Sequence, residues 1–504
     1  MRAVLTVLAA LALLGPAARA GEVEPEPEPS RPQRPSRPLS LQEAIALALQ
    51  HNLVLAAEKI NPKVAQTVVV EQEAVFDPSA YGEFNRSKSK EQSTTGLFGQ
   101  HQHLVDGTVG VAKLLAPGTL VDVHVGGNRE WNDFPFTEIN PSYTEEWGVN
   151  ISQPLLRGFG VRVNTAGIAT AVNERRIAQA QLRQVGLDTV ADVTKGYWGL
   201  VLAVRARELI QRSLDRARGL QREVGIRVDA GALARRPNVA QAQAEVAVRQ
   251  EGVVKAQQAI RDAEDALKVI TDLAADDAIW DVALLPTTAP PEAVPALDPA
   301  SAVATALAKR PDYRQAQLTI DNQEIVLYVR RNELKPKLDL TASYGNSGLN
   351  GSWEEADHDF RTFDYYQWAI GLSFEYPLGN RAARARFRKA KLRRTQARIN
   401  LTALERQIQL ELRNAVRAVH TSVESLRAAE QSVQAEEARL SAETEKFKQG
   451  QDVTTQDLLD AQAALAEAER RELAALIALN QALVDVDRLR GTLLEKHNVT
   501  WEDE

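Results

Sequence analysis

Apolar residues recur along this chain at two different periods, and each period predicts its own kind of element. In the second half, apolar residues stand seven apart without a break; they are Leu412, Val419, Leu426, Val433, Leu440 and Phe447. The same spacing returns later, at Leu479, Val486 and Leu493. An unbroken heptad repeat predicts long helices that pack along one seam and wind around each other with a left-handed twist.

Elsewhere apolar residues alternate with small or polar ones, which predicts strands. Such segments are AYGEFNRS from Ala80, LDLTASYG from Leu338 and WAIGLSFEYPL from Trp368. In the last of them Ile370 and its alternate neighbours form an apolar face, whereas the opposite face carries alanine, glycine, serine and glutamate. This pattern is typical of a strand between lipid and a wet lumen. An ordinary half-buried sheet is the alternative.

The chain also repeats its own order of elements, which predicts a tandem duplication. An offset of 258 places Pro78 on Pro336, and each of these prolines ends a predicted helix and precedes a strand. An offset of 223 places Pro154 on Pro377, where we expect strand-to-helix turns. Each copy is predicted to contain a short helix, a strand, a loop, a strand, a long helix, a turn and a further helix.

The difference between the two offsets, 258 − 223 = 35, is the number of extra residues in the first copy. They include VDGTVGVAKLLAPGTLVDVHVGGN, in which two alternating runs flank Pro117 and Gly118. We expect an added hairpin there. The sequence does not place it.

Lengths of the helical arms suggest how the helices complete one another. The helix from about 382 to 448 is predicted to span roughly 100 Å, because an α-helix rises about 1.5 Å per residue, whereas the arm from about 237 to 272 reaches about half of that. We therefore expect the helix from Ala300 to about Glu333 to complete the arm 237–272. By the same reasoning the first helix, from Leu41, would complete the arm that follows Asp457.

The N-terminus has the features of a secretory signal: a basic Arg2, an apolar stretch and an Ala18-Arg19-Ala20 ending. A stretch in which proline alternates with charge follows it and predicts an extended leader. The predicted divisions are 1–20 signal peptide, 21–38 proline-rich disordered leader, 39–275 first repeat, 276–299 equatorial linker, 300–497 second repeat and 498–504 tail.

Composition narrows the class of protein further. Beyond the signal no apolar run approaches the roughly 20 residues of a spanning helix, which argues against a helical membrane protein. The chain has no cysteine, so disulfides, thiolate metal sites and a cysteine nucleophile are excluded. A net charge of -7 in 504 residues is mild and does not point to nucleic acid.

Because HExxH, P-loop and GxSxG motifs are absent, we predict neither an enzyme nor a cofactor. We interpret His101 and His103 as part of a polar loop, with no metal.

Several phrases together resemble the TolC-like outer-membrane efflux protein family, the outer membrane factors. They are LSLQEAIALALQHN, QPLLRGFG, YPLGNRAARARFRKA, DAGALARRPNVAQAQ and KQGQDVTTQDLLDAQ, and the resemblance runs from about Leu39 to His497. It implies an α+β membrane protein built from a tandem repeat, a homotrimer whose protomers jointly close one outer-membrane β-barrel continued by a long α-helical coiled-coil periplasmic tunnel. The implied barrel has twelve strands, or more if the hairpin near Pro117 joins it.

The same resemblance implies a function. The chain would be the exit duct of a tripartite efflux or type I secretion system, passing small molecules or polypeptides to the exterior. Its partners would be a periplasmic adaptor, an inner-membrane pump of the RND, ABC or MFS type, and the outer-membrane lipid. A periplasmic coiled-coil scaffold or adhesin is the alternative, and a hydrolase with helical arms is a second one. The alternating strands count against the scaffold.

The resemblance also carries candidate sites. Two turns that reverse the long helices are expected to bind the adaptor: Ala230, Gly231, Ala232 and Leu233, and Gln449, Gly450, Gln451 and Asp452. Helix caps alone would also explain their glycines. Asp457 and Asp460 are expected to line and gate the periplasmic aperture, although two solvated carboxylates at a helix start are the plainer interpretation. The first copy has Asn238 and Gln241 in their place.

A basic run from Arg381 to Arg394 begins the long helix that follows the second predicted turn out of the sheet. A solvated helix face is the usual explanation for such a run. Contact with anionic lipid head groups is the alternative.

Overall fold

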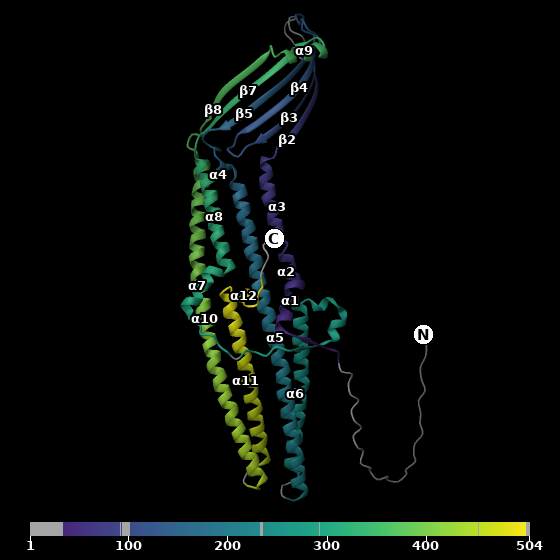
Figure 1. Cartoon of the computed structure of the whole chain (residues 1–504), viewed down its shortest axis with the longest axis vertical. Helices are drawn as coiled ribbons and strands as arrows, with labels where there is room; N and C mark the ends of the chain where they lie inside the picture. Colours follow the sequence, from purple (N-terminus) through teal and green to yellow (C-terminus); the bar gives the residue numbers. More distant parts are fainter. Residues whose placement is uncertain are drawn as a thin grey trace, which may run out of the picture.

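The computed structural model describes residues 34–90, 92, 101–231, 235–291, 293–451 and 453–499. Long helices run along one axis, and a single large sheet continues them at one end (Figure 1). Among the described residues no helix is long and apolar enough to cross a membrane. The predicted signal peptide, the leader up to residue 33, the tip residues Ala232, Leu233 and Asp452, and residues 500–504 lie outside the described part.

The large sheet is antiparallel throughout and has the strand order β2-β3-β4-β5-β7-β8. The predicted strand segments are confirmed. The hairpin around Pro117 forms two interior strands of this sheet, β3 and β4, so the first copy supplies four strands and the second two. His101 and His103 lie in β3 rather than in a loop. The strands are β2 (Ser79–Lys90), β3 (His101–Leu114), β4 (Leu120–Asn132), β5 (Ser142–Pro154), β7 (Lys337–Asn350) and β8 (Tyr366–Glu375).

Strand pairing sorts the side chains of the sheet onto two faces, because directly opposed residues of antiparallel strands point to the same side. We name them the apolar face and the polar face. Successive pairs across the sheet place on the apolar face Ala80, Val111, Val123, Val149, Tyr344 and Trp368. The next row on the polar face contains Tyr81, Gly110, His124, Gly148, Gly345 and Gln367.

Each copy has one long helix and several shorter ones. The predicted heptad seam lies in α10, where Leu412, Val419 and Phe447 are buried and α10 packs against α11. Leu493, the last residue of the second heptad series, belongs to α12 rather than to α11. The helices are α1 (Leu41–His51), α2 (Leu53–Glu58), α3 (Asn61–Glu73), α4 (Val161–Asn164), α5 (Ala166–Asp229), α6 (Arg235–Ile270), α7 (Pro299–Lys309), α8 (Pro311–Asn332), α9 (Trp353–Thr362), α10 (Arg381–Lys448), α11 (Thr455–Leu489) and α12 (Leu493–Lys496).

The predicted partnership between short helices and arms is wrong. The side chain of Asn52, between α1 and α2, donates from Nδ2 to the carbonyl oxygen of Ile270 at the end of α6, at 2.9 Å. In the other copy Lys309, at the end of α7, forms an ion pair with Glu495 just beyond α11. The first helices therefore complete the arm of their own copy, and α8 completes α11 (Figure 1). Length matching could not distinguish these arrangements, because the two short helices offer similar lengths.

The largest hydrophobic core lies near the middle of the molecule, where α1, α5, α6, α11 and α12 meet. Tyr197 of α5 is fully buried in it; its hydroxyl donates to the carbonyl oxygen of Leu39 at 3.0 Å and accepts from the Thr288 N–H at 2.8 Å. These bonds fasten the segments before α1 and after β6 (Ala283–Pro286) to the core.

The end of the predicted leader has a defined place in the structure. Residues 36–39 form β1 (Ser36–Leu39), which pairs in parallel with β6 of the linker. Arg34 adds an ion pair with Glu264, whose side chain is buried. The leader boundary predicted at residue 38 is therefore corrected to a position before Arg34, because a pairing partner about 250 residues away leaves no trace in local composition.

Candidate functional site

The apolar face of the sheet exposes many large hydrophobic side chains. On β8 it carries Trp368, Ile370, Leu372 and Phe374, whose exposed fractions are 66%, 70%, 68% and 67%. β8 and β2 are the two edges of the sheet, and neither pairs with a further described strand. An exposed apolar face with two unpaired edges is unstable in water, so both need to be covered.

The polar face carries a connected hydrogen-bond network. Asp122 of β4 accepts from the Tyr81 hydroxyl at 2.7 Å and from Asn150 at 3.2 Å, and it lies 3.0 Å from the His124 ring nitrogen Nδ1. Glycines make room for the rings: a Cβ at Gly110 would meet the Tyr81 ring at 2.6 Å. This face suits contact with water.

Aromatic side chains gather at the end of the apolar face that lies farthest from the helices. Trp147 packs edge-on against Phe363, and Tyr143 against Trp353, the first residue of α9. Aromatic rings at the border of an apolar band are typical of the membrane–water interface. α9 lies across this end of the sheet (Figure 1).

The two predicted turn prolines lie where the chain leaves the sheet. Pro154 is the last residue of β5 and is opposed by Asp339. Pro377 follows β8, and its carbonyl oxygen accepts from the Asn380 N–H at 3.1 Å in a tight turn before α10. Gly379 in this turn has φ 83°, a conformation that glycine adopts without steric cost.

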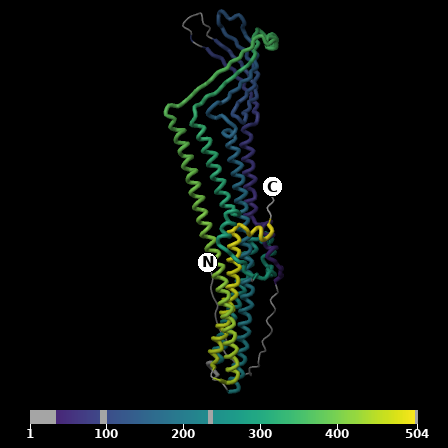
Figure 2. The backbone as a smooth tube through the Cα atoms, turned by 60° about the vertical axis from the view of Figure 1, so that its left-hand side comes forward, coloured from purple at the N-terminus to yellow at the C-terminus, as the bar shows by residue number. Residues whose placement is uncertain are grey.

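At the opposite end of the molecule the helical hairpins turn at Gly231 and Gly450. These glycines have φ 74° and 71°, and their N–H groups donate to the carbonyl oxygens of Val228 and Phe447, so both turns are αL helix caps of the same kind. The two hairpins end side by side (Figure 2). Among the other described tip residues, Ala230, Gln449 and Gln451 are exposed.

A buried cluster joins the two hairpins directly above the tips, and we name it the tip cluster. Phe447 of α10, 2% exposed, is its centre, and the Arg227 guanidinium of α5 lies 4.2 Å from the centroid of its ring. Residues of all four helices contribute to the tip cluster: Leu220, Val224, Val228, Phe447, Leu458 and Leu459, with Val239, Leu440 and Val453 at its margin.

Asp457 and Asp460 lie on the exposed side of the first turns of α11. Asp457 forms a capping box, in which Oδ2 accepts from the Thr454 N–H at 2.8 Å and hydroxyl at 2.7 Å. These hydrogen bonds, with a smaller contribution from Arg439 of α10, hold the pKa of Asp457 below its ordinary value. Asp460 accepts from Gln456 at 2.8 Å. The structure thus brings an arginine near this pair that sequence reasoning missed, because the arginine lies on a different helix.

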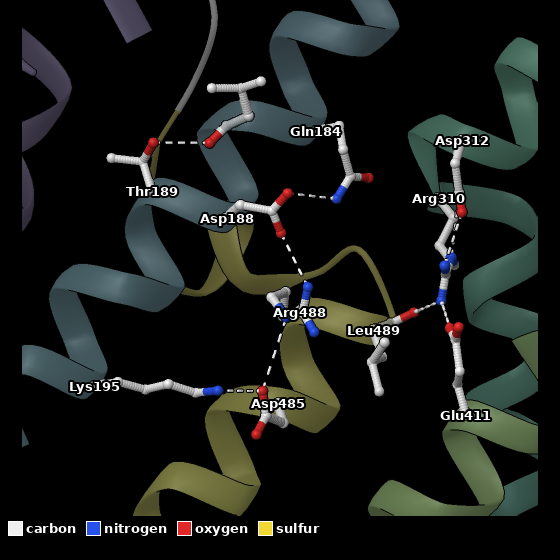
Figure 3. A network of polar contacts seen from close by, with 11 residues as sticks. Gln184, Asp188, Thr189, Lys195, Arg310, Asp312, Glu411, Asp485, Arg488 and Leu489 are labelled. Carbon is white, nitrogen blue, oxygen red and sulfur yellow. Dashed lines mark hydrogen bonds and ion pairs between the residues drawn. The ribbon is translucent and has the colours of Figure 1, made fainter. Parts of the chain in front are cut away.

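A band of ion pairs at the middle of the molecule joins the two copies. Asp188 of α5 binds Arg488 of α11 at 3.0 Å, and Lys195 of α5 binds Asp485 at 2.6 Å (Figure 3). Nearby, Arg310 binds Asp312 and Glu411 of α10. No group of side chains that could hold a metal ion occurs in the described ranges.

A two-faced membrane-type sheet that continues into long helical hairpins defines the fold of an outer-membrane channel protomer. The sequence profile described as "Outer membrane efflux protein" matches residues 120–271 and 302–492. The chain belongs to the outer membrane efflux protein family, as predicted. Its sheet is the outer-membrane part and its helices are the large periplasmic part. The two matched segments fall in the two predicted copies, which confirms the duplication.

Solved structures support the same fold. The Campylobacter jejuni CmeC outer membrane channel matches with a TM-score of 0.61 at 18% identity, covering 90% of this chain and 85% of that one. Vibrio cholerae VceC matches at 0.62 and 18%, covering 90% and 96%. The open state of the Neisseria gonorrhoeae MtrE channel matches at 0.62 and 20%, covering 90% and 89%. No curated protein matches the chain.

Proposed function

We propose that three copies of this chain form the exit duct of a tripartite efflux or type I secretion system. The observation that carries the proposal is the two-faced sheet with two unpaired edges, β2 and β8. In lipid an open edge would leave backbone groups without hydrogen-bond partners, so β8 of one protomer pairs with β2 of the next until the barrel closes. Channels of this family are trimers, which sets the number of copies.

Three six-stranded sheets give a barrel of 3 × 6 = 18 strands. This exceeds the twelve strands implied by resemblance, because β3 and β4 are added in each protomer. Barrel diameter grows with strand number, and barrels of 16 to 18 strands leave an aqueous channel. The duct therefore has a wide exit at the cell surface.

The periplasmic tips provide the proposed contact with a periplasmic adaptor, which in turn connects the duct to an inner-membrane pump of the RND, ABC or MFS type. Support for this role is that the ends of α5, α6, α10 and α11 at which the hairpins turn lie farthest from the sheet (Figure 1). The cargo is small molecules or polypeptides, selected by the pump rather than by the duct. Asp457 and Asp460 form the proposed charged gate at the mouth.

Cysteine crosslinking tests the closure of the barrel, and the chain suits it because it has no native cysteine. One cysteine replaces Gln367 on the edge strand β8, and a second is scanned along β2. We expect one register to yield a disulfide-linked ladder up to three protomers, together with a threefold mass by native mass spectrometry and a steady conductance in planar bilayers. A monomeric, non-conducting protein would refute the proposal.

A further inference from the structure

The apolar face changes character towards its extracellular end. On β2 the outward residues are Ala80, Gly82 and Phe84, followed by Arg86 and Lys88 at the same alternate spacing. On β4 the apolar series is interrupted by Arg129, which precedes Trp131 and lies in one row with Arg86 across Val105. The three cations therefore stand side by side on the lipid face, directly beyond the apolar band.

These cations are open to the exterior. Arg86, Lys88 and Arg129 are exposed, and no carboxylate of the described residues forms an ion pair with Arg86 or Lys88. Arg129 is oriented by Tyr143, whose hydroxyl accepts from its Nε at 3.1 Å, which leaves the other guanidinium nitrogens available. All three are charged neighbours of His103. We name Arg86, Lys88 and Arg129 the basic rim.

A groove of about 760 Å³ lies directly below the basic rim on the same face. Its floor includes Gly107 and Gly127, which have no side chains, and one wall is formed by Trp353 and Phe360 of α9. Phe84, Val109 and Val125 add apolar surface, and Arg129 itself borders the groove. Its size falls within the roughly 300 to 1,000 Å³ of typical ligand pockets.

The groove and the basic rim together fit a single ligand that has one anionic end and one apolar end. The wall of α9 is held in place, because Asn346, fully buried, donates from Nδ2 to the Phe360 carbonyl oxygen at 2.6 Å. Glu145 also borders the groove, but its charged neighbours are Asp357 and Arg361 of α9, on the side away from Arg86 and Lys88. The cationic end is thus at β2 to β4, at the level of lipid head groups, and the apolar hollow is at the level of acyl chains.

We propose that this surface binds a phosphate-bearing, acylated lipid of the outer leaflet. Its phosphate lies among Arg86, Lys88 and Arg129, since guanidinium groups bind phosphate through paired N–H donors. One acyl chain crosses Gly107 and Gly127 and packs against Trp353 and Phe360. The proposal rests on the outer-membrane placement of the sheet, and it gives the added hairpin β3–β4 a role in anchoring the channel to its lipid.

Native mass spectrometry of the detergent-purified full-length protein tests the proposal, with bisphosphorylated lipid A as the probe. We expect retained lipid, and a loss of affinity of roughly tenfold or more when Arg86→Gln, Lys88→Gln and Arg129→Gln are combined, because hydrogen bonds to phosphate that are strengthened by a charged donor are then replaced by weaker neutral ones. Enzymatic removal of the lipid phosphates should weaken binding to the wild type in the same way. The matched control is Arg406→Gln, Arg413→Gln and Arg427→Gln, which removes three exposed cations of the periplasmic helix α10 and should change nothing.

A second variant tests the groove without altering charge. A Cβ at Gly107 would meet its nearest neighbours at 3.7 Å, so Gly107→Leu fits the strand and projects into the groove. We expect it to weaken lipid A retention while oligomer mass and bilayer conductance stay unchanged. Equal retention by the rim triple variant and wild type, or equal binding of dephosphorylated lipid A, would overturn the proposal. Intact conductance of the variants separates that failure from a failure of the channel function.

Discussion

Asn52 and Arg310 occupy equivalent places in the two copies, and each donates to the last helical carbonyl of its own copy's final arm. Asn52 binds the carbonyl oxygen of Ile270 at 2.9 Å, and Arg310 binds that of Leu489 at 3.5 Å. The donors are 258 residues apart, which is the first offset of the duplication. The acceptors are 219 apart, the same separation as that between the tip glycines Gly231 and Gly450. Both copies thus keep a hydrogen bond between stacked helices at this place, although different side chains donate it.

Removing the Arg310 side chain should destabilise the molecule more than removing that of Asn52. The Arg310 side chain is 13% exposed and also binds Asp312 at 2.7 Å and Glu411 at 2.8 Å, so Arg310→Ala leaves two carboxylates without their cationic partner. We expect a cost of about 2 kcal/mol or more. Asn52→Ala loses one neutral hydrogen bond and the cap on Leu55, about 1–2 kcal/mol. Thermal unfolding of the oligomer measures both, with the exposed Arg314→Ala as control. A smaller loss of stability for Arg310→Ala than for Asn52→Ala would contradict the role assigned to Arg310 between the stacked helices.

The elements that the sequence predicted well are those whose signal is local. Three signals depend only on near neighbours in the sequence: the heptads that end at Phe447, the alternation that begins at Trp368, and the glycines at 231 and 450. The structure has the corresponding helix, strand and turns at the predicted positions. The place of the Pro117 hairpin could not be derived this way, because alternation predicts a strand but not its neighbours. Its position between β2 and β5 follows only from pairing over long distances.

Two helix breaks were missed although their signals were present. The helix predicted from Ala300 to about Glu333 is interrupted at Arg310, because Pro311 has no N–H and begins a new helix at its first position. The first helix is interrupted at Asn52, whose side chain caps α2 by accepting from the Leu55 N–H at 3.0 Å. The rim cations Arg86 and Lys88 also had a signal: the apolar alternation on β2 switches to basic residues without a change of period.

Neutralising Glu472 should stabilise the hairpin of α10 and α11 at neutral pH. Burial, and then the nearby Glu430, Glu437 and Glu469, raise the pKa of Glu472, so the folded state binds its proton more tightly than the unfolded chain does. The penalty for its charge is therefore present above the folded pKa and disappears as the pH falls towards the ordinary value. Glu472→Gln should raise the melting temperature at pH 7 to 8, and the difference should vanish below about pH 4. If the difference in melting temperature between Glu472→Gln and the wild type were constant across this pH range, the cause would be packing rather than the charge of Glu472.

Bulky charges at the tips should abolish adaptor binding without affecting assembly. Gly231→Arg with Gly450→Arg places two cations on turns that lie far from the sheet and from the main core. Because both positions have positive φ, the matched control is Gly231→Asn with Gly450→Asn, which tolerates that conformation and adds no charge. Crosslinking in cells measures adaptor contact. If the arginine variant still crosslinks and supports export, the tips are helix caps only.

Phe447→Ala should loosen the periplasmic mouth. The ring is 2% exposed and packs in the tip cluster that joins both hairpins, so its removal should cost about 3–5 kcal/mol of local stability. Faster amide exchange at the ends of α5 and α10, and more frequent opening in bilayer recordings, would follow. Phe447→Leu, which keeps most of the apolar volume and loses the contact with Arg227, serves as the milder control. Unchanged exchange in Phe447→Ala would show that the tip cluster does not hold the hairpins together.

Asp457 and Asp460 should give the mouth its preference for cations. In a trimer, six carboxylates repeated around a narrow entrance create a negative potential, because the field of the ring is focused between low-dielectric walls. Polyvalent cations should bind there and block the current, and salt should weaken the block, since the Debye length at 0.1 M is about 10 Å.

The double variant Asp457→Asn and Asp460→Asn tests this ring while keeping the helix start intact, because an asparagine oxygen can still accept from the Thr454 N–H at position 457. We expect lower cation selectivity and no polyvalent block, whereas Glu467→Gln, farther along α11 and paired with Arg470, should change neither. The pH dependence is a further check. Because Thr454 holds the pKa of Asp457 below its ordinary value, that carboxylate stays charged over the whole range in which an ordinary aspartate is charged, and the block should persist unchanged from pH 8 to pH 5. Planar-bilayer recordings with unaltered selectivity and block in the double variant would leave these aspartates as the capped, solvated start of α11 and nothing more.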